Sequence, residues 1–218
     1  MDVTCQKQLT PKAIDGLAGA LARAFHDDPF FVHVMADAAR RAAQLHWWMR
    51  CALHYGLSYG EVYATGALSG AAIWLPPDAP DISIARAVLT GWWQVPWRLG
   101  ITAAGRLWRL DANRDSTAES LPSRRWYLMT LGVAPEHQGH GLGSALLQPV
   151  LRTADAAGLP CYLQTATERD VAFYRKHGFD ITGESPLGAG GRFWAMVRPG
   201  NAAASSCSFR SPTWRPIP

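Results

Sequence analysis

The stretch EHQGHGLGSALLQPVL, residues 136–151, carries three evenly spaced glycines, Gly139, Gly141 and Gly143, directly before an apolar pattern with helical spacing. Glycine loses more conformational freedom on folding than any other residue, so a cluster of glycines calls for a compensating role. Backbone N–H groups without neighbouring side chains can approach a ligand closely. The N-terminus of the following helix adds free N–H donors and a positive dipole end, which suit phosphate. These residues therefore predict a loop that binds a pyrophosphate.

Two common phosphate motifs do not fit this loop. A nucleotide P-loop requires Gly-Lys-Ser or Gly-Lys-Thr, which the stretch lacks. The dinucleotide pattern Gly-x-Gly-x-x-Gly is not matched either, because single residues separate the three glycines. The simpler alternative is a tight turn that only links a strand to a helix. We favour the phosphate loop, because a strand pattern precedes it and a helix pattern follows it.

The charge of the chain is unevenly distributed. Residues 1–184 hold 17 of the 21 Lys and Arg residues and all 17 Asp and Glu residues, so the body of the protein is neutral. The net charge of +4 therefore comes from the arginines of residues 185–218. A neutral body lacks the broad basic face of nucleic-acid-binding proteins, and we expect no nucleic-acid partner. With 218 residues and 48% hydrophobic residues, the chain can fill one substantial core.

Cysteine usage and the apolar runs indicate the compartment. The four cysteines are scattered, and neither a C-x-x-C pair nor a Cys/His spacing suggests a metal site. Free thiols in a reducing cytoplasm are therefore expected. The N-terminus shows no signal-peptide pattern, and no apolar run approaches the roughly 18 residues of a membrane span. We predict a cytoplasmic protein without a metal.

The first half of the chain predicts two helices followed by a β-hairpin. The first helix begins after Thr10 as N-cap, with Pro11 at its first position, and Pro29 helps to end it. The second helix runs from about residue 38 to 55, with Asp37 as a possible cap. The stretches EVYAT and GAAIWLP then alternate as two strands joined by a short turn.

The second half of the chain predicts alternating strands and helices. A strand at 126–133 precedes the glycine loop, and a helix follows it to about residue 157. The stretch PCYLQTA predicts a strand and ERDVAFYRKHG a short helix that Gly178 closes. FDITGES and RFWAMVR complete the series as strands. The order strand, loop, helix, strand, helix, strand, strand indicates an α/β fold with a mixed sheet.

These stretches resemble the GNAT family of N-acetyltransferases. The family's acetyl-CoA signature, Gln/Arg-x-x-Gly-x-Gly/Ala between a strand and a helix, is present as QGHGLG at residues 138–143. LGVAPEHQG, YLQTA and FYRKHGF stand at the family spacing, so the resemblance covers about residues 126–198. EVYATGALSGAAIWLPP and AFHDDPFF resemble in particular the branch that contains puromycin N-acetyltransferase.

The resemblance implies a mixed, largely antiparallel sheet flanked by helices, with splayed central strands. It implies a single N-acetyltransferase domain over residues 1–198, with an acetyl-CoA-binding core at about 126–198. The composition of residues 199–218, rich in Ala, Ser, Pro and Asn, predicts a disordered tail.

The resemblance also implies where acetyl-CoA binds. In the family, the glycine loop holds the pyrophosphate, and pantetheine lies between the splayed strands. Here residues 131–133 would face that gap opposite residues 162–165. An N–H group of residues 131–133 would stabilise the oxyanion, and we assign that of Val133 to cofactor binding. The implied cofactor-binding residues are Leu131, Gly132, Val133, Gln138, Gly139, His140, Gly141, Leu142, Gly143 and Asp170.

Tyr174 matches the family tyrosine near the CoA sulfur, where its phenol could protonate the departing thiolate. The alternative is a half-buried aromatic residue that anchors a short helix. Two residues depart from the family pattern. Gln164 stands where related sequences often have a glutamate base, and Asp170 replaces a familiar asparagine. Gln164 can only orient a hydroxyl or a water, and Asp170 would repel the CoA phosphates unless it is turned away.

A relocated base is one consequence of these departures. Asp27 and Asp28 are candidates to take the amine proton or to bind a cationic acceptor, because this region borders the acceptor site in the family. The alternative is that Asp28 and Pro29 only form a turn at the helix end.

The tryptophan-rich segment 82–110 has three interpretations. It could be a lid over the acceptor pocket, which suits an aromatic or hydrophobic amine, or a pair of amphipathic helices split by Pro96 and Gly100. It could also touch an anionic membrane through its arginines. We favour the packed helices, and the neutral body argues against membrane contact.

The function predicted from the sequence is acetyl transfer from acetyl-CoA to a primary amine of a small molecule, by direct transfer in a ternary complex. The alternative is a weak or inactive acyl-CoA-binding module that senses its ligand, because of Gln164 and Asp170. We expect a monomer or a homodimer.

Overall fold

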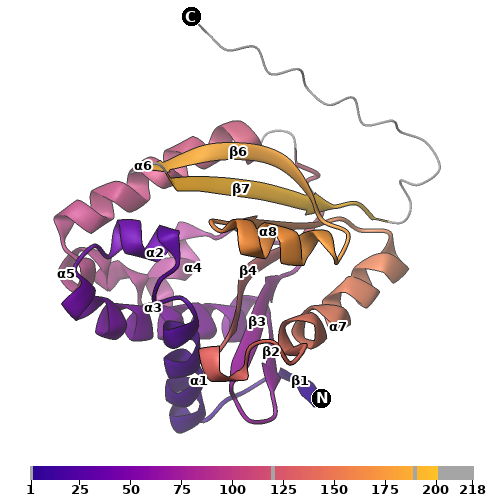
Figure 1. Cartoon of the computed structure of the whole chain (residues 1–218), viewed down its shortest axis with the longest axis horizontal. Helices are drawn as coiled ribbons and strands as arrows, with labels where there is room; N and C mark the ends of the chain where they lie inside the picture. The colour runs from indigo at the N-terminus through magenta and orange to yellow at the C-terminus, as the bar shows by residue number, and fades with distance from the viewer. Residues whose placement is uncertain (1, 119–120, 189–190, 201–218) are drawn as a thin grey trace, which may run out of the picture.

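A single seven-stranded sheet organises the computed structural model, which describes residues 2–118, 121–188 and 191–200 (Figure 1). The strand order is β1-β2-β3-β4-β5-β7-β6, and all neighbours are antiparallel except β4 and β5. This confirms the predicted mixed, largely antiparallel sheet. The predicted tail lies outside the described residues from residue 201 onward. The strands are β1 Val3–Gln6, β2 Glu61–Thr65, β3 Gly70–Leu75, β4 Trp126–Val133, β5 Cys161–Thr165, β6 Asp180–Gly188 and β7 Gly191–Arg198.

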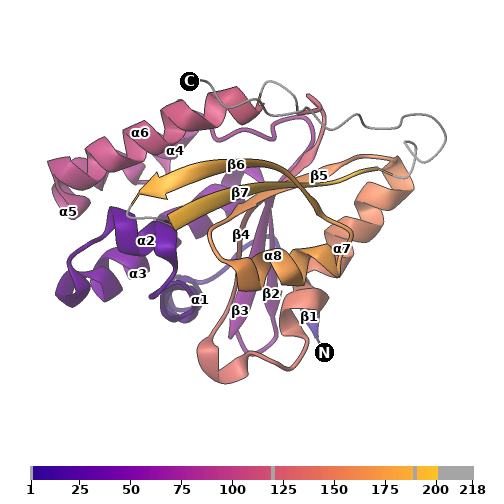
Figure 2. The same ribbon diagram turned by 45° about the horizontal axis from the view of Figure 1, so that its top comes forward.

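Helices cover both faces of the sheet (Figure 2). On one face lie α1, Pro11–Ala24, and α3, Ala38–Tyr59, which pack against β2, β3 and β4. On the other face α7, Leu142–Ala157, packs against the same strands, and α8, Glu168–Arg175, joins the same apolar cluster. Both predicted N-caps of the first face are confirmed: Thr10 Oγ1 accepts the N–H of Ala13 at 3.3 Å, and Asp37 caps α3.

Strand β3 lies at the centre of the core and is buried along its whole length. Ala71 and Ile73 pack with α1 and α3, whereas Ala72 and Trp74 pack on the face of α7. Successive side chains of a strand point to opposite faces, so a strand covered on both sides has to be apolar throughout. This explains why GAAIWL lacks the alternation of a half-exposed strand.

The two central strands separate at one end, as the resemblance implied. Strands β4 and β5 pair only from Trp126–Cys161 to Leu128–Leu163, although β4 continues to Val133. Opposite this region, β4 carries a β-bulge against β3, because Thr130 and Leu128 face consecutive residues of β3. The edge of β4 beyond Leu128 therefore faces an opening instead of a neighbouring strand.

The N-terminal half departs from the prediction in two places. Strand β1 and the short helix α2, Pro29–Val34, were not predicted. Pro29 begins α2 rather than only ending α1, and Asp28 Oδ1 accepts the Phe30 N–H at 2.9 Å as its N-cap. Proline suits the first position of a helix because its missing N–H has no partner there.

The segment 82–110 also differs from the predicted pair of helices. It forms three helices and a 3₁₀ turn, and the last helix extends beyond the segment to Ala118. Gly91, with φ 104°, and Gly100, with φ 87°, separate the pieces, whereas Pro96 lies in the first turn of α5. The elements are α4 Ile84–Leu89, η1 Trp92–Gln94, α5 Val95–Leu99 and α6 Ile101–Ala118.

No helix within the described ranges is long and apolar enough to cross a membrane. Of the cysteines that the structure describes, Cys5, Cys51 and Cys161 are free thiols.

A bidentate ion pair fastens the end of β7 to the last turn of α7. Arg198 donates to the two carboxylate oxygens of Asp155 at 2.6 and 2.8 Å, and this lowers the pKa of Asp155. The pair therefore stabilises the fold above the ordinary pKa of aspartate and loses its effect below pH 4. We expect Asp155→Asn to lower the free energy of unfolding at pH 7 by about 1 kcal/mol, measured by urea unfolding. Asp78→Asn, which breaks the exposed Arg124–Asp78 pair, is the control without a measurable shift.

Candidate active site

The opening between β4 and β5 continues into a cleft of about 1350 Å³. Its walls come from α1, α2, α3, the tryptophan-rich segment, the glycine loop, α8 and β7. Of the predicted site residues, His140 alone is not in its lining; the exposed His140 ring lies 3.4 Å from the His137 carbonyl oxygen. The predicted residues that line the cleft are Asp27, Asp28, Leu131, Gly132, Val133, Gln138, Gly139, Gly141, Leu142, Gly143, Gln164, Asp170 and Tyr174.

The three glycines of the loop serve different purposes. Gly139 and Gly141 have φ values of 80° and 75°, in the left-handed region that other residues rarely adopt. A Cβ on Gly139 would meet nothing within 4 Å, so the absent side chain leaves open space at that point. A Cβ on Gly143 would lie 3.3 Å from the ring of Phe173, so this glycine allows α7 to approach α8.

The start of α7 presents unused backbone donors to the cleft. Its first helical hydrogen bond runs from the Ala145 N–H to the Gly141 carbonyl at 3.0 Å. The N–H groups of Leu142, Gly143 and Ser144 precede that bond and have no acceptor within the helix. All three residues line the cleft, so this end of α7 suits an anionic group.

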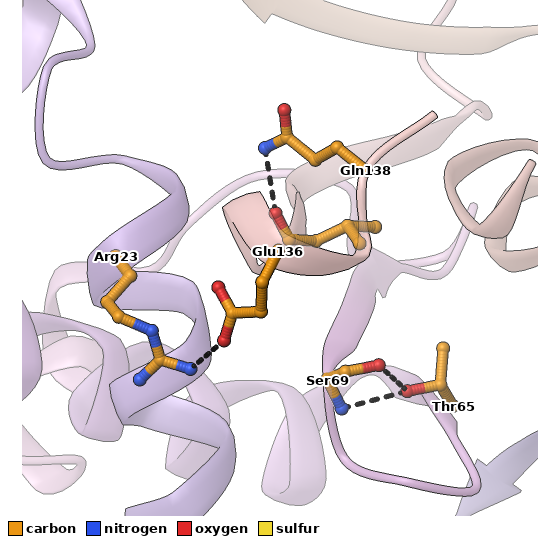
Figure 3. Close-up of polar contacts among 6 residues, drawn as sticks. Arg23, Thr65, Ser69, Glu136 and Gln138 are labelled. Atoms are coloured by element: carbon orange, nitrogen blue, oxygen red, sulfur yellow. Dashed lines mark hydrogen bonds and ion pairs between the residues drawn. The ribbon is translucent and has the colours of Figure 1, made fainter. Parts of the chain in front are cut away.

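Side-chain contacts hold the glycine loop in place. Gln138 donates through Nε2 to the Val133 carbonyl at 2.9 Å and accepts from Arg169 Nη2 at 2.6 Å. Beside it, Arg23 of α1 donates to Glu136 Oε1 at 2.9 Å, and in the β2–β3 turn the Ser69 N–H donates to Thr65 Oγ1 at 3.0 Å (Figure 3). The Gln138 amide is thus engaged with the protein, and it connects β4 to α8.

At the other end of the opening, Asp28 is a carboxyl group with an unusual pKa. Burial raises its pKa to about 6, and the charge of Asp170 acts in the same direction, against the lowering effect of backbone N–H donors of α2. Asp27 differs sharply: its side chain is 92% exposed and lies 2.9 Å from the ring of His26. The structure therefore distinguishes the two candidate carboxylates: Asp28 is partly buried and Asp27 is exposed.

Tyr174 lies close enough to Asp28 and Asp170 for both charges to raise the pKa of its phenol. It is buried in the apolar cluster around α7, and burial, followed by Asp170 and Asp28, raises the pKa of its phenol above the ordinary value. Its hydroxyl therefore remains protonated at physiological pH. A protonated phenol near the open edge of β4 can donate a proton to a leaving group.

Asp170 is oriented by β5 and by its own helix. Thr165 Oγ1 donates to Asp170 Oδ2 at 3.4 Å, and Thr167 Oγ1 accepts the Asp170 N–H at 3.1 Å as the N-cap of α8. The charge of Asp170 raises the pKa values of Asp28 and Tyr174. These contacts turn the carboxylate toward β5 and the other two side chains. Gln164 also lines this part of the cleft, on β5 opposite Ala195 of β7.

A group of polar side chains near the glycine loop was not predicted from the sequence. Arg169, Lys176, His177 and Ser144 all line the cleft. His177 donates through Nδ1 to the Phe173 carbonyl at 2.9 Å, and its Nε2 lies within hydrogen-bond distance of the Ser144 hydroxyl, at 3.0 Å. The cleft is therefore basic beside the loop and acidic at Asp28. The motif FYRKHGF contained part of this signal, but only the fold brings Ser144 and His177 together.

Comparison with known proteins connects this geometry to a family. The acetyltransferase (GNAT) family model matches residues 22–179. An uncharacterized N-acetyltransferase of Schizosaccharomyces pombe is 24% identical over 180 residues, which cover 79% of this chain and 73% of that protein.

Solved structures share the fold. The crystal structure of histone acetyltransferase HPA2 and related acetyltransferase from Corynebacterium glutamicum has a TM-score of 0.65 and 22% identity, over 92% of this chain and 97% of that one. The PaiA N-acetyltransferase of Thermoplasma acidophilum, solved in complex with coenzyme A, has a TM-score of 0.50 and 11% identity, over 91% and 99%.

The family match extends over well more than half of the chain and spans the splayed strands, the glycine loop and α8. The chain therefore belongs to the acetyltransferase (GNAT) family and is an acetyl-CoA-dependent N-acetyltransferase.

Proposed function

We propose that this enzyme transfers the acetyl group of acetyl-CoA to the primary amine of a small molecule, by direct attack in a ternary complex. The observation that carries this proposal is the position of Asp28 and Tyr174, which come together in the cleft at the open edge of β4. One has a raised pKa near neutrality and suits a base, and the other is a protonated phenol.

The basic end of the cleft would hold the phosphates of acetyl-CoA. The N–H groups of residues 139–144 and the positive end of α7 would bind the pyrophosphate. Arg169 and Lys176 would add positive charge there. The free edge of β4 would bond the amides of pantetheine, with Val133 among the contacts, and an N–H group of residues 131–133 would stabilise the oxyanion.

At the acidic end, Asp28 would bind the incoming ammonium and accept one of its protons. The neutral amine nitrogen then forms a bond to the thioester carbonyl carbon, and the carbon–sulfur bond breaks as the oxyanion collapses. Tyr174 gives its hydroxyl proton to the thiolate and recovers a proton from the amide nitrogen, and Asp28 releases its proton to solvent. Gln164 would orient the amine or a water. Asp28 thus supplies the base that Gln164 cannot be, which favours an active enzyme over a sensing module.

The puromycin N-acetyltransferase branch stays a prediction. Within this fold, substrates differ widely, so a branch resemblance does not by itself assign the acceptor.

A variant of the glycine loop directly tests the proposed binding of acetyl-CoA. We expect Gly141→Ala to raise the Kd for coenzyme A at least about tenfold, because a side chain at φ 75° distorts the loop and crowds its N–H groups. Gly158→Ala is the matched control, since Gly158 has φ 63° at the opposite end of the same helix and does not line the cleft. Both variants should lose stability, measured by thermal unfolding. Calorimetric titration that gave equal Kd values for both would contradict the assignment of the loop.

A further inference from the structure

We infer that the acceptor is an amine with one cationic centre and an aromatic or extended apolar body, bound with its ammonium at Asp28. This inference rests on the proposed function and names the substrate class of the same site. The evidence for it is the aromatic part of the cleft beyond Asp28, which the proposed binding of acetyl-CoA does not use.

A continuous series of aromatic rings forms the wall of this part of the cleft. Phe193 of β7 contacts Phe30 with ring centroids 5.7 Å apart, and Phe30 contacts Phe31 at 4.9 Å. Phe31 meets Trp48 of α3 at 6.0 Å, and Trp48 stacks on Trp92 of η1 at 5.3 Å. All five side chains line the cleft. Four separate elements thus contribute aromatic surface to one cavity, which suits a flat apolar ligand.

The five aromatic residues of this wall carry no charge, and Asp28 stands next to them as the N-cap of α2. Among the described residues that line the cleft, the acidic ones are Asp27, whose side chain is 92% exposed, and Asp28 and Asp170, whose charges both act on Tyr174. The described lining residues of α3 to α6 carry no charge. A second ammonium of a polyamine would lose hydration against this wall and find no carboxylate among its described residues, which costs free energy. A single amine at Asp28 avoids this penalty.

The mouth of the cleft is apolar as well. Ile84 of α4 and Trp108 of α6 both line it, yet they are 78% and 74% exposed. Large exposed apolar residues that gather around a cavity are typical of a ligand-binding surface. An acceptor with an apolar body would cover both side chains, whereas a short aliphatic amine would reach neither.

Trp108 and Trp97 offer a matched pair of variants. Trp97 of α5 is 77% exposed like Trp108, but it does not line the cleft. The probes are tryptamine, ethylamine and spermidine, with acetyl-CoA as donor and thiol release as readout. We expect tryptamine to have the highest kcat/KM, and Trp108→Ala to raise its KM about tenfold with little change in kcat. Trp97→Ala should leave the KM unchanged, and neither variant should affect ethylamine.

Calorimetric titration of tryptamine into the CoA-bound protein separates this inference from the proposed function. Binding that weakens in Trp108→Ala and not in Trp97→Ala supports the aromatic subsite even if no amine releases thiol, in which case the proposed transfer is wrong. A higher kcat/KM for spermidine than for tryptamine, or equal effects of the two tryptophan variants, would overturn the inference while the transfer reaction stands.

Discussion

Asp28→Asn is expected to lower kcat/KM for the amine about 100-fold, the scale of a lost general base, and to leave the Kd for coenzyme A unchanged. Asparagine cannot accept the ammonium proton, but it caps a helix as well as aspartate does, so α2 should keep its start. Asp27→Asn is the matched control, because the Asp27 side chain is almost fully exposed. Equal activity losses in the two variants would contradict the role of Asp28.

The pH dependence of the same variant gives a second readout. Only ionised Asp28 can accept a proton, so kcat/KM of the wild-type enzyme should fall below a pKa of about 6. The residual kcat/KM of Asp28→Asn should not show this fall at acidic pH. If Asp28 were purely structural, the variant would have lower activity but would still lose kcat/KM at acidic pH.

Asp28→Asn should raise the free energy of unfolding although it lowers the activity. Burial raises the pKa of Asp28 in the folded protein from 3.8 to about 6, so its charge destabilises the fold above pH 6. This penalty disappears as the pH falls from 6 to about 4 and the buried carboxyl takes up its proton. Asp28→Asn should therefore be more stable than the wild type at pH 8, on the order of 1–2 kcal/mol, with no gain at pH 4. Urea unfolding at the two pH values measures the difference.

Tyr174→Phe is expected to lower kcat about 100-fold, because the variant cannot protonate the leaving thiolate. The Kd for coenzyme A should change less than threefold, since the ring and its packing against Phe173 and Phe179 remain. Tyr63→Phe is the control: its hydroxyl donates to Glu61 at 2.7 Å on β2, outside the cleft.

The raised pKa of Tyr174 also predicts how its role depends on pH. Because its phenol stays protonated well above pH 8, kcat of the wild type should not fall between pH 8 and pH 9.5. A parallel loss of kcat and of CoA affinity in Tyr174→Phe would instead identify the tyrosine as a structural residue of α8.

Most regular elements could be predicted from local patterns. The caps at Thr10 and Asp37 and the apolar strands β3 and β4 are encoded by neighbouring residues, which is why their positions were correct. Helix α2 escaped prediction because Asp28 and Pro29 form a helix end and a helix start at once. In the tryptophan-rich segment, Gly100 was a predicted break, whereas the break at Gly91 was not predicted, because the sequence does not show which glycines adopt a positive φ.

The part of the cleft at the glycine loop could be predicted from the sequence, and the part around Asp28 less so. The glycine loop is contiguous, so its residues appear together in the sequence. Asp27 and Asp28 are adjacent and look equivalent in the sequence, and only tertiary packing exposes one and partly buries the other. The same holds for Asp170, whose carboxylate direction is set by Thr165 of a different element.

Direct transfer is tested by thiol release from acetyl-CoA by the purified protein, measured with and without tryptamine and together with mass analysis of the amine product. Direct transfer to an amine predicts that thiol release depends on tryptamine and that one N-acetyltryptamine forms for each CoA released. Binding of acetyl-CoA without amine-dependent release, for tryptamine and for ethylamine and spermidine alike, would contradict it.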